Sequence, residues 1–412
     1  MRPNLKRILL IILFILVGII IGFAIYFVFF KRALPDIFRR PATPIGQPGT
    51  LPTAGGRTPG QPAGDTTGAP TSNLPIAGNI PTAQTILNIP QAVTQITTDL
   101  ASFPSTNIGN GVTRYYNGSD GKFYKTQADG TVKSMTDQVF FNVASVTWAK
   151  SKDVAVLEYP DLTKIVYNFD LNKQTFSPPK HWQSFSFSPA GEQLAAMSIG
   201  LARENRWLVT VNTDGTGTKL VEPLGDNADQ VTMDWSPSRQ VVAFSTTGQP
   251  QGFDRREVLF VGLNHENFKS TVVEGMGFQP QWSTTGQKLL YSVYSGRSDW
   301  KPELWVVNAY GDQIGSNRQM LNLNTWADKC AFANDSAIFC AVPRDLEQGA
   351  GMSPDIAIAN LYDLYKIDLQ TGTKINIPLT KDYHIKDVSY DAINNKVLFT
   401  DNFQNGIFQV NL

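Results

Sequence analysis

One ten-residue pattern recurs along this chain, and it limits the possible folds more than any other feature. The copy that begins at Trp235 reads WSPSRQVVAF, in which an aromatic residue and a Ser-Pro turn precede an apolar run. Related copies have their first aromatic residue at Trp148, Phe187, Trp282, Phe332 and Tyr390, and a degenerate copy fits at Phe103. A strand-forming unit that repeats roughly every 40–60 residues predicts the blades of a β-propeller.

Each copy is followed by two further strand-like runs, except the last, which has only IFQVNL. An open sheet edge invites pairing with other chains, so another strand is expected there. The run QAVTQITT at residues 91–98 has strand composition and precedes the first copy. We therefore predict an all-β fold, a seven-bladed propeller over residues 91–412 in which residues 91–98 close the ring. Six blades are the alternative, because the Phe103 copy is weak.

The pattern aromatic-Ser-Pro-x-Gly-x-x-apolar resembles the repeat of TolB-like propellers, which is itself similar to the WD-type repeat. The resemblance covers about residues 91–412 and is strongest at Phe187–Ala196, Trp235–Phe244 and Trp282–Tyr291. The usual Ser-Pro-Asp-Gly turn is replaced by SPAG, SPSR and STTG in these copies. The chain also lacks room for the α/β domain of TolB itself, so the role of TolB does not carry over. The resemblance implies a protein-binding or ligand-binding propeller, often in a bacterial envelope.

The first 90 residues have a different composition. After a short tail at residues 1–7, residues 8–30 carry no charge and would span roughly 35 Å as a helix, enough to cross a bilayer. They predict one transmembrane helix in contact with lipid. Residues 31–90 are rich in Pro, Gly and Thr and predict a disordered linker. Positive charges flank residues 8–30 almost equally on both sides, which leaves the orientation open.

Long links between strands are expected on one face of the ring, and loops on a rigid scaffold often carry binding residues. The longest link, residues 343–363, is the segment most expected to bind. Arginine and aromatic side chains are typical of interfaces. The candidate binding residues on this face are Trp182, Arg203, Arg206, Arg255, Arg256, Arg297, Trp300, Trp326, Arg344 and Tyr383.

Two interpretations of these arginines stay open. The acids Glu204, Asp254, Asp299 and Asp345 are close to them in sequence, which predicts local ion pairs. Alternatively, the arginines form a recognition surface for a protein, a peptide or a glycan.

The two cysteines, Cys330 and Cys340, flank the turn of one copy, in CAFANDSAIFC. A turn centred on Asp335 would place them opposite each other on neighbouring antiparallel strands, close to disulfide geometry. A disulfide favours an oxidising compartment and therefore a propeller outside the cytoplasm. Two buried free thiols are the alternative.

Composition and motifs exclude several classes of function. The 35 basic residues balance the 35 acidic ones, which does not fit a protein that binds nucleic-acid phosphates. The three histidines are far apart, and no nucleophile elbow, phosphate loop or zinc-protease motif is present. We therefore predict no catalytic residue, no metal and no cofactor.

We expect a single-pass membrane protein that displays a non-catalytic binding or scaffold propeller at the cell envelope. One alternative is an enzyme with carboxylates at the central pore, such as a glycoside hydrolase. Another is a membrane-tethered scaffold in the cytoplasm. The sequence does not predict the oligomeric state.

Overall fold

The computed structural model describes residues 78–79, 84–86, 89–127 and 130–412. The chain divides into two compact units, Met1–Thr71, which lies outside the described residues, and Ser72–Leu412. The transmembrane helix predicted at residues 8–30 and most of the linker predicted at residues 31–90 therefore fall outside the described residues. No helix in the described ranges is both long enough and apolar enough to cross a bilayer.

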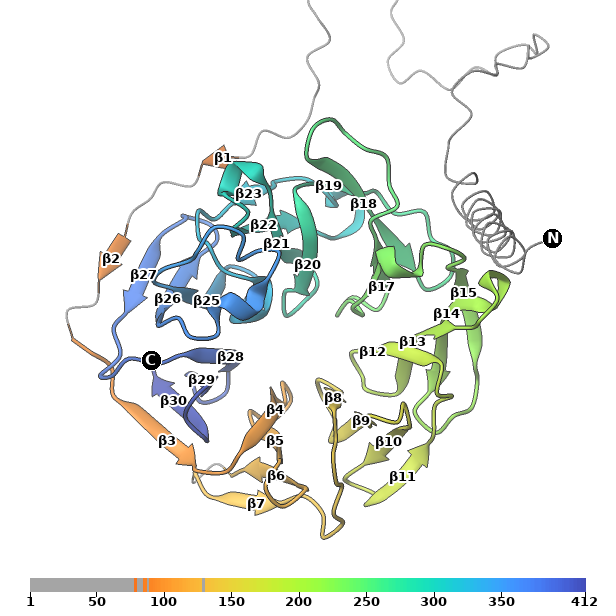
Figure 1. Cartoon of the computed structure of the whole chain (residues 1–412), viewed down its shortest axis with the longest axis horizontal. Coiled ribbons are helices and arrows are strands. Elements are labelled where there is room, and N and C mark those ends of the chain that lie inside the picture. The colour runs from red at the N-terminus through yellow and green to blue at the C-terminus, as the bar shows by residue number, and fades with distance from the viewer. Residues whose placement is uncertain (1–77, 80–83, 87–88, 128–129) are drawn as a thin grey trace, which may run out of the picture. The chain divides into compact units, whose positions relative to one another are not determined.

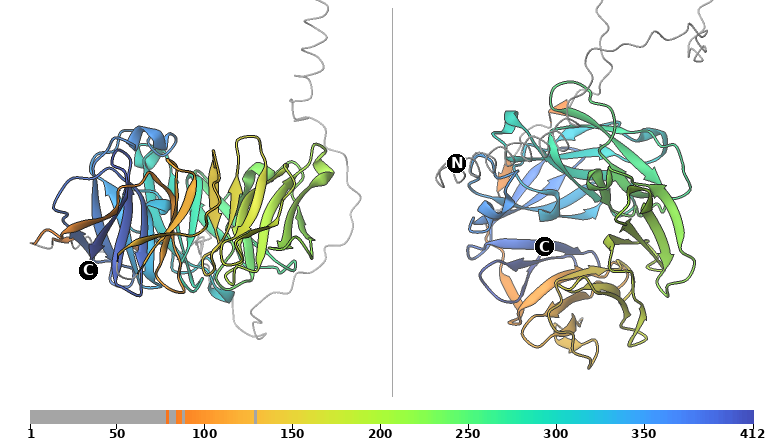
Figure 2. Two further views of the ribbon diagram at one scale, coloured as in Figure 1. Left: turned by 90° about the horizontal axis from the view of Figure 1, so that it is seen from below. Right: turned by 45° about the vertical axis from the view of Figure 1, so that its right-hand side comes forward.

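Seven sheets stand around a central axis (Figure 1), and Figure 2 shows the same ring from the side. Each sheet has four antiparallel strands, and two of the sheets carry a fifth, parallel strand. The all-β, seven-bladed prediction is confirmed, and the six-bladed alternative is wrong. We number the blades 1 to 7 in chain order. The first strand of each blade lies innermost, and later strands lie progressively outward (Figure 1).

Blade 1 contains β4 (Ala101–Thr106), β5 (Thr113–Asn117), β6 (Lys122–Thr126) and β7 (Val132–Ser134). Blade 2 contains β8 (Ser145–Trp148), β9 (Val154–Glu158), β10 (Lys164–Asn168) and β11 (Lys173–Phe176). Blade 3 contains β12 (Trp182–Phe187), β13 (Gln193–Ile199), β14 (Arg206–Asn212) and β15 (Lys219–Pro223). Blade 4 contains β16 (Val231–Met233), β17 (Val241–Ser245), β18 (Arg255–Gly262) and β19 (Thr271–Glu274).

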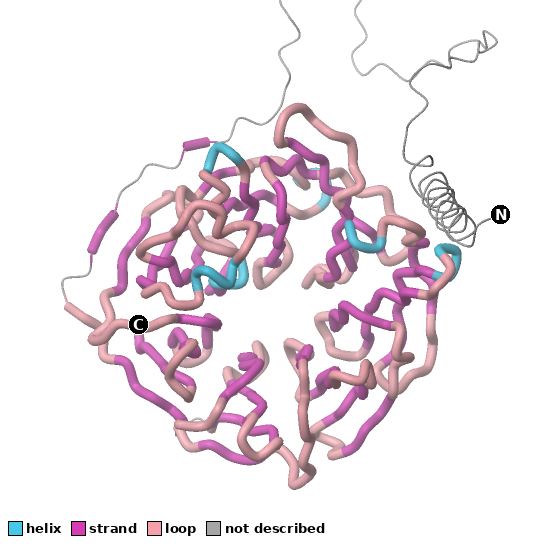
Figure 3. The backbone as a smooth tube through the Cα atoms, in the orientation of Figure 1, coloured by secondary structure: helices cyan, strands magenta, loops and turns pink. Residues whose placement is uncertain are grey.

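Blade 5 contains β20 (Met276–Trp282), β21 (Lys288–Tyr294), β22 (Pro302–Asn308) and β23 (Gln319–Met320). Blade 6 contains β24 (Cys330–Asn334), β25 (Ala337–Pro343), β26 (Tyr362–Asp368) and β27 (Lys374–Ile377). Blade 7 contains β28 (Ile385–Asp391), β29 (Lys396–Asp401), β30 (Ile407–Asn411) and β3 (Val93–Thr97). Short helices occupy links between strands (Figure 3): η2 (Arg203–Asn205), η3 (Ala228–Gln230), η4 (Gly296–Ser298), η5 (Gly311–Gln313), η6 (Ala327–Lys329) and η7 (Pro354–Ala357).

The recurring aromatic residues join consecutive blades. The indole nitrogen of Trp148 donates a hydrogen bond to the backbone oxygen of Phe103, 3.0 Å away in blade 1. In the same way, the indole of Trp282 donates to the backbone oxygen of Asp234, 3.0 Å away in blade 4. The Trp282 ring also stacks on Phe244, with centroids 5.2 Å apart. Each tryptophan thus buries apolar area against the preceding blade and keeps its N–H bonded, which explains why the aromatic recurs.

The copy predicted at Phe103 is correct as a blade but offset in position. In blades 2 to 5 the residue after the anchor donates its backbone N–H across the hairpin, as Ser283 donates to Lys288 after Trp282. In blade 1 the equivalent donor is Asn107, which bonds to Val112, so the anchor position is Thr106. Phe103 instead lies in a β-bulge, with φ 53°. The anchor position of blade 1 therefore holds a threonine, whose hydroxyl donates to the hydroxyl of Ser389 in blade 7 at 3.0 Å.

The buried guanidinium of Arg114 lies on the other side of blade 1, against blade 2. It lies 4.6 Å from the centre of the Trp148 ring and 3.3 Å from a carboxylate oxygen of Asp153. It also donates to the backbone oxygen of Ala149 at 3.0 Å. The cation, the ring and the carboxylate thus add a polar contact to the aromatic cluster around Phe123 that joins blades 1 and 2.

Residues from the two ends of the described chain close the ring. Strand β3 pairs antiparallel with β30, with Val93 opposite Val410 and Thr97 opposite Ile407. The segment predicted at residues 91–98 thus completes blade 7 as its outermost strand (Figure 1).

Two further strands lie within the segment for which a linker was predicted. Strand β1 (Gly78–Asn79) pairs parallel with β23, and β2 (Gln84–Ile86) pairs parallel with β27. The backbone nitrogen of Gln91 then donates to the oxygen of Pro378 at 2.7 Å. The chain therefore follows the outer edges of blades 5 and 6 before it enters blade 7 (Figure 1).

Candidate binding face

The strand order divides the links between strands into two sets. Because neighbouring strands in a blade are antiparallel, the link from second to third strand and the link to the next blade leave the same end of the ring. We call this end the long-loop face. All ten candidate binding residues lie at this end, either on such links or within two residues of the strand ends that they join.

One buried carboxylate gathers several of the arginines. The oxygens of Glu274 lie 3.4 Å from Arg255, 2.9 Å from Arg297 and 2.8 Å from Arg318. The Glu274 side chain is only 6% exposed, so its charge is balanced by guanidinium groups rather than by water. Arg318, which was not among the predicted candidates, is itself almost fully buried.

Most of the other arginines also pair with acids. Arg203 and Arg206 both approach Asp226, at 3.7 Å. Arg344 holds two carboxylates. Arg256 is exposed and has no ion pair among the residues that the structure describes.

The interpretation as local ion pairs identified the wrong acids. Arg344 lies 2.8 Å from Asp363 and 2.8 Å from Asp382, not beside its neighbour Asp345. The correct partners come from strand ends and from the next link, because extended backbone points adjacent side chains in different directions. The ion pairs therefore tie links to each other and fix the shape of the face.

The predicted aromatic residues lie mostly beneath the face. Trp182, Trp326 and Tyr383 are 6%, 7% and 4% exposed, and they pack in the apolar core. Trp300 is half-buried, and its ring meets Tyr294 edge-on with centroids 6.4 Å apart. These residues support the links rather than face outward.

Apolar side chains that were not predicted are the ones that project from this face. Every blade contributes at least one of them, from a link or from a strand end, and exposures are high, as with Phe253 at 92% and Phe403 at 63%. A signal was present in the sequence, namely large apolar residues inside links that are otherwise polar. The set includes Leu100, Phe141, Leu162, Leu201, Phe253, Met276, Met352, Ile356, Ile358 and Phe403. The opposite face exposes fewer, and these include Ile108, Leu171, Tyr310 and Ile393.

The long link of blade 6, residues 344–361, folds back as a compact layer that we call the cap. Its backbone nitrogens at Gly349 and Gly351 donate to the backbone oxygens of Asp299 and Trp300 in blade 5, at 3.0 and 2.7 Å. A Cβ atom at Gly351 would lie 2.5 Å from the Cβ of Tyr294, so only glycine allows this approach.

Further contacts hold the cap from below and from blade 7. Ala350 and Ala357 are fully buried and pack on Trp326. The side-chain amide of Asn402 in blade 7 donates to the backbone oxygen of Ile358 at 3.1 Å. The segment predicted as the most probable binding link is therefore attached to three blades.

The structure joins Cys330 and Cys340 in a disulfide. The two residues are direct partners across β24 and β25, and both are buried. They lie in an interblade core rather than on the face.

Two carboxyl groups near the axis have raised pKa values. Burial raises the pKa of Asp234 to about 6, although Lys150 opposes the shift. Asp328 is exposed at its surface, but partial desolvation by the surrounding protein raises the pKa of its carboxyl group. The nearby negative charge of Asp387 also raises this pKa. Asp234 follows strand β16 and Asp328 precedes β24, so they lie at opposite ends of the inner strands and do not converge.

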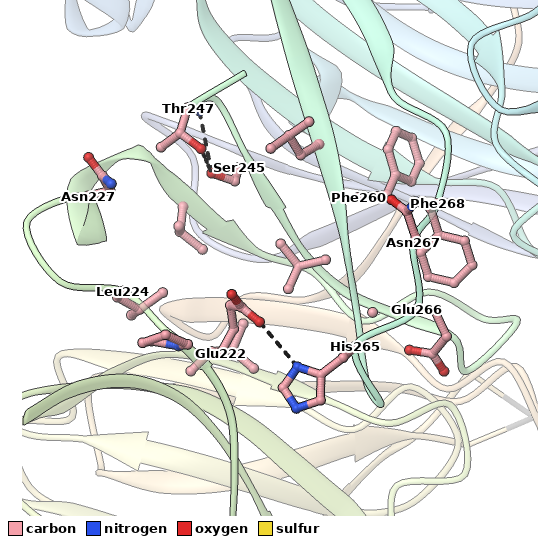
Figure 4. A pocket seen from close by; sticks show the side chains of 16 residues that line it. Glu222, Leu224, Asn227, Ser245, Thr247, Phe260, His265, Glu266, Asn267 and Phe268 are labelled. Carbon is pink, nitrogen blue, oxygen red and sulfur yellow. Dashed lines mark hydrogen bonds and ion pairs between the residues drawn. The ribbon is translucent and has the colours of Figure 1, made fainter. Parts of the chain in front are cut away.

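A hollow of about 500 Å³ lies between blades 3 and 4 (Figure 4). It is lined in part by Leu259–Gly262, the half of β18 that does not pair with β19. At its edge, Nδ1 of His265 and a carboxylate oxygen of Glu222 are 3.4 Å apart. None of the predicted candidate residues lines this hollow.

No protein-family model matches this sequence, and neither does any curated protein. Among solved structures, the β-propeller domain of Cps50 (Swd1) from Myceliophteria thermophila is 12% identical with a TM-score of 0.53, covering 78% of this chain and 99% of that one. Oligogalacturonate lyase in complex with manganese is 13% identical with a TM-score of 0.52, covering 78% and 93%. TolB from Acinetobacter baumannii is 12% identical with a TM-score of 0.42, covering 63% and 60%. At such identities the comparisons show the fold alone, and the chain resembles WD-type propellers at that level.

Proposed function

We propose that this chain is a non-catalytic recognition module whose long-loop face docks a protein partner. The observation that carries the proposal is the set of large apolar side chains that links and strand ends of all seven blades expose on that face. Apolar groups that gather on one surface usually mark an interaction site. The ion pairs around Glu274 and Arg344 hold the links in place, so little ordering entropy would be lost on binding.

The proposal includes a membrane tether. Residues 8–30 would anchor the chain in the bilayer, and residues 31–77 would form a spacer of about 40 Å if they behave as a flexible coil. Such a spacer lets the face meet a partner at a distance from the membrane.

We place the propeller outside the cytoplasm, and the disulfide supports this placement, since disulfides persist in oxidising compartments. The test is alkylation of the full chain in intact cells, followed by denaturation without reductant and a second alkylation. We expect Cys330 and Cys340 to stay unlabelled in both steps. If the cysteines were labelled only in the second step, after denaturation, they would be free buried thiols, which would contradict export.

The docking proposal is tested by photo-crosslinking in cells from single positions on the two faces. A photoreactive residue replaces Phe253 or Phe403 on the long-loop face, and Leu171 or Ile393 on the opposite face as matched exposed controls. We expect discrete crosslinked products from the first pair only. Equal products from both faces, or none from the long-loop face, would contradict the proposal.

The enzyme alternative has a specific comparison behind it, since oligogalacturonate lyase shares the fold. The manganese in that structure has no matching donor set here, because the described residues contain no group of three or more His, Cys, Asp or Glu side chains placed to hold a metal. Incubation of the full chain with oligogalacturonate and Mn²⁺ tests this alternative directly. We expect no unsaturated uronide product, and its formation would favour the enzyme.

A further inference from the structure

The cap and the adjacent link of blade 7 form one apolar surface with acidic residues around it. Met352, Ile356 and Ile358 of the cap are 53%, 43% and 44% exposed, and Phe403 of blade 7 is 63% exposed. The hydrogen bond from Asn402 to the Ile358 backbone brings the two links together.

The ring of Phe403 is held beside the cap by a histidine. The His384 ring meets Phe403 edge-on, with centroids 4.7 Å apart. Nδ1 of His384 lies 3.0 Å from the backbone oxygen of Asn360, at the end of the cap. The apolar side chains are thus presented by a backbone that is fixed on both sides, which reduces the entropy cost of binding.

The acids of the cap have no cationic partner within the part of the chain that the structure describes. Asp345, Glu347 and Asp355 are exposed and form no ion pair there. The single cation of the cap, Arg344, is already matched by Asp363 and Asp382. The surface therefore combines uncompensated negative charge with exposed apolar area.

Resting on the proposed function, we infer that the cap surface binds a protein segment that carries apolar side chains flanked by Lys or Arg. The apolar groups of the segment would cover Ile356, Ile358 and Phe403, and its cations would approach Glu347 and Asp355. Electrostatic complementarity of this kind sets partner choice and association rate. An anionic membrane surface fits poorly, because its phosphates would face the same acids.

The test uses the full chain in detergent and a labelled 18-residue helical peptide made only of Leu and Lys, with binding to micelles alone subtracted. A peptide of Leu and Glu serves as the charge control. We expect the double variant Glu347→Lys/Asp355→Lys to bind the Leu/Lys peptide about tenfold more weakly, whereas Asp170→Lys on the opposite face leaves binding unchanged. Unchanged binding by the double variant, or an equal loss with Asp170→Lys, would overturn the inference.

The apolar contribution is tested by Ile358→Ser/Phe403→Ser against Ile393→Ser, with thermal unfolding to verify that each variant is folded. We expect weaker peptide binding only in the first variant, and the same partition of the wild type and of both variants into anionic vesicles. If only the Ile358→Ser/Phe403→Ser variant partitioned less into anionic vesicles, the surface would be a lipid-binding surface and the inference would be overturned. If the peptide result fails while crosslinks from Phe253 persist, the docking proposal stands and only the partner chemistry assigned to the cap is wrong.

Discussion

Asp234 shows how the repeat places a carboxyl group in an unfavourable site. Its backbone oxygen accepts the Trp282 indole, so the residue is fixed against blade 5, and burial raises the pKa of its side chain to about 6. The folded chain therefore holds this proton more tightly than the unfolded chain, whose Asp titrates near 4. By linkage, Asp234 lowers the free energy of unfolding as the pH rises from about 4 to about 6.

Asp234→Asn should remove this contribution. We expect the variant to match the wild type at pH 4 and to exceed it by about 2 kcal/mol in the free energy of unfolding at pH 7. Urea unfolding at both pH values measures the difference. A difference that does not change with pH would contradict the raised pKa.

The sequence predicted individual residues where the repeat requires them. It did not predict residues whose partners come from another blade or another link. Trp148 and Trp282 were identified because the same chemistry recurs at the same spacing. Arg114 was missed, because its partners Trp148 and Asp153 belong to the next blade and only the fold brings them beside it. The partners of Glu274 were likewise hidden, since they converge from three separate links.

At the level of elements, the closing strand β3 was predicted because an incomplete last blade needs a fourth strand. Strands β1 and β2 were not, since two or three residues are too few for an alternating pattern to show. Their parallel pairing lengthens the contact between the N-terminal chain and the ring, so tension on the tether would reach these strands before it reaches β3.

Two truncations separate these contributions. Removal of residues 1–90 deletes β1 and β2 but keeps β3, and removal of residues 1–98 deletes all three. We expect the first to remain folded, and the second to lower the midpoint of thermal unfolding by about a further 10 °C or to aggregate through the open edge of β30. Similar midpoints of thermal unfolding for the two truncated chains would show that β3 does not close the ring.

At the scale of the whole molecule, the sequence predicted the ring and the face on which long links gather, but not the surface that this face presents. The predicted arginines are largely neutralised, and three of the predicted aromatic residues are buried. The exposed groups are instead large apolar side chains of links and strand ends. Their exposure depends on how the links of neighbouring blades pack against each other.

Side-chain oxidation by hydroxyl radicals compares this face in two states of the full chain, in native membranes and after purification. Phe253, Met352 and Phe403 report on the long-loop face, and Leu171 and Tyr310 report on the opposite face. We expect the first three to be oxidised less in native membranes than in the purified chain, with the other two unchanged. Equal oxidation of Phe253, Met352 and Phe403 in both states, or protection confined to Leu171 and Tyr310, would contradict recognition through the long-loop face.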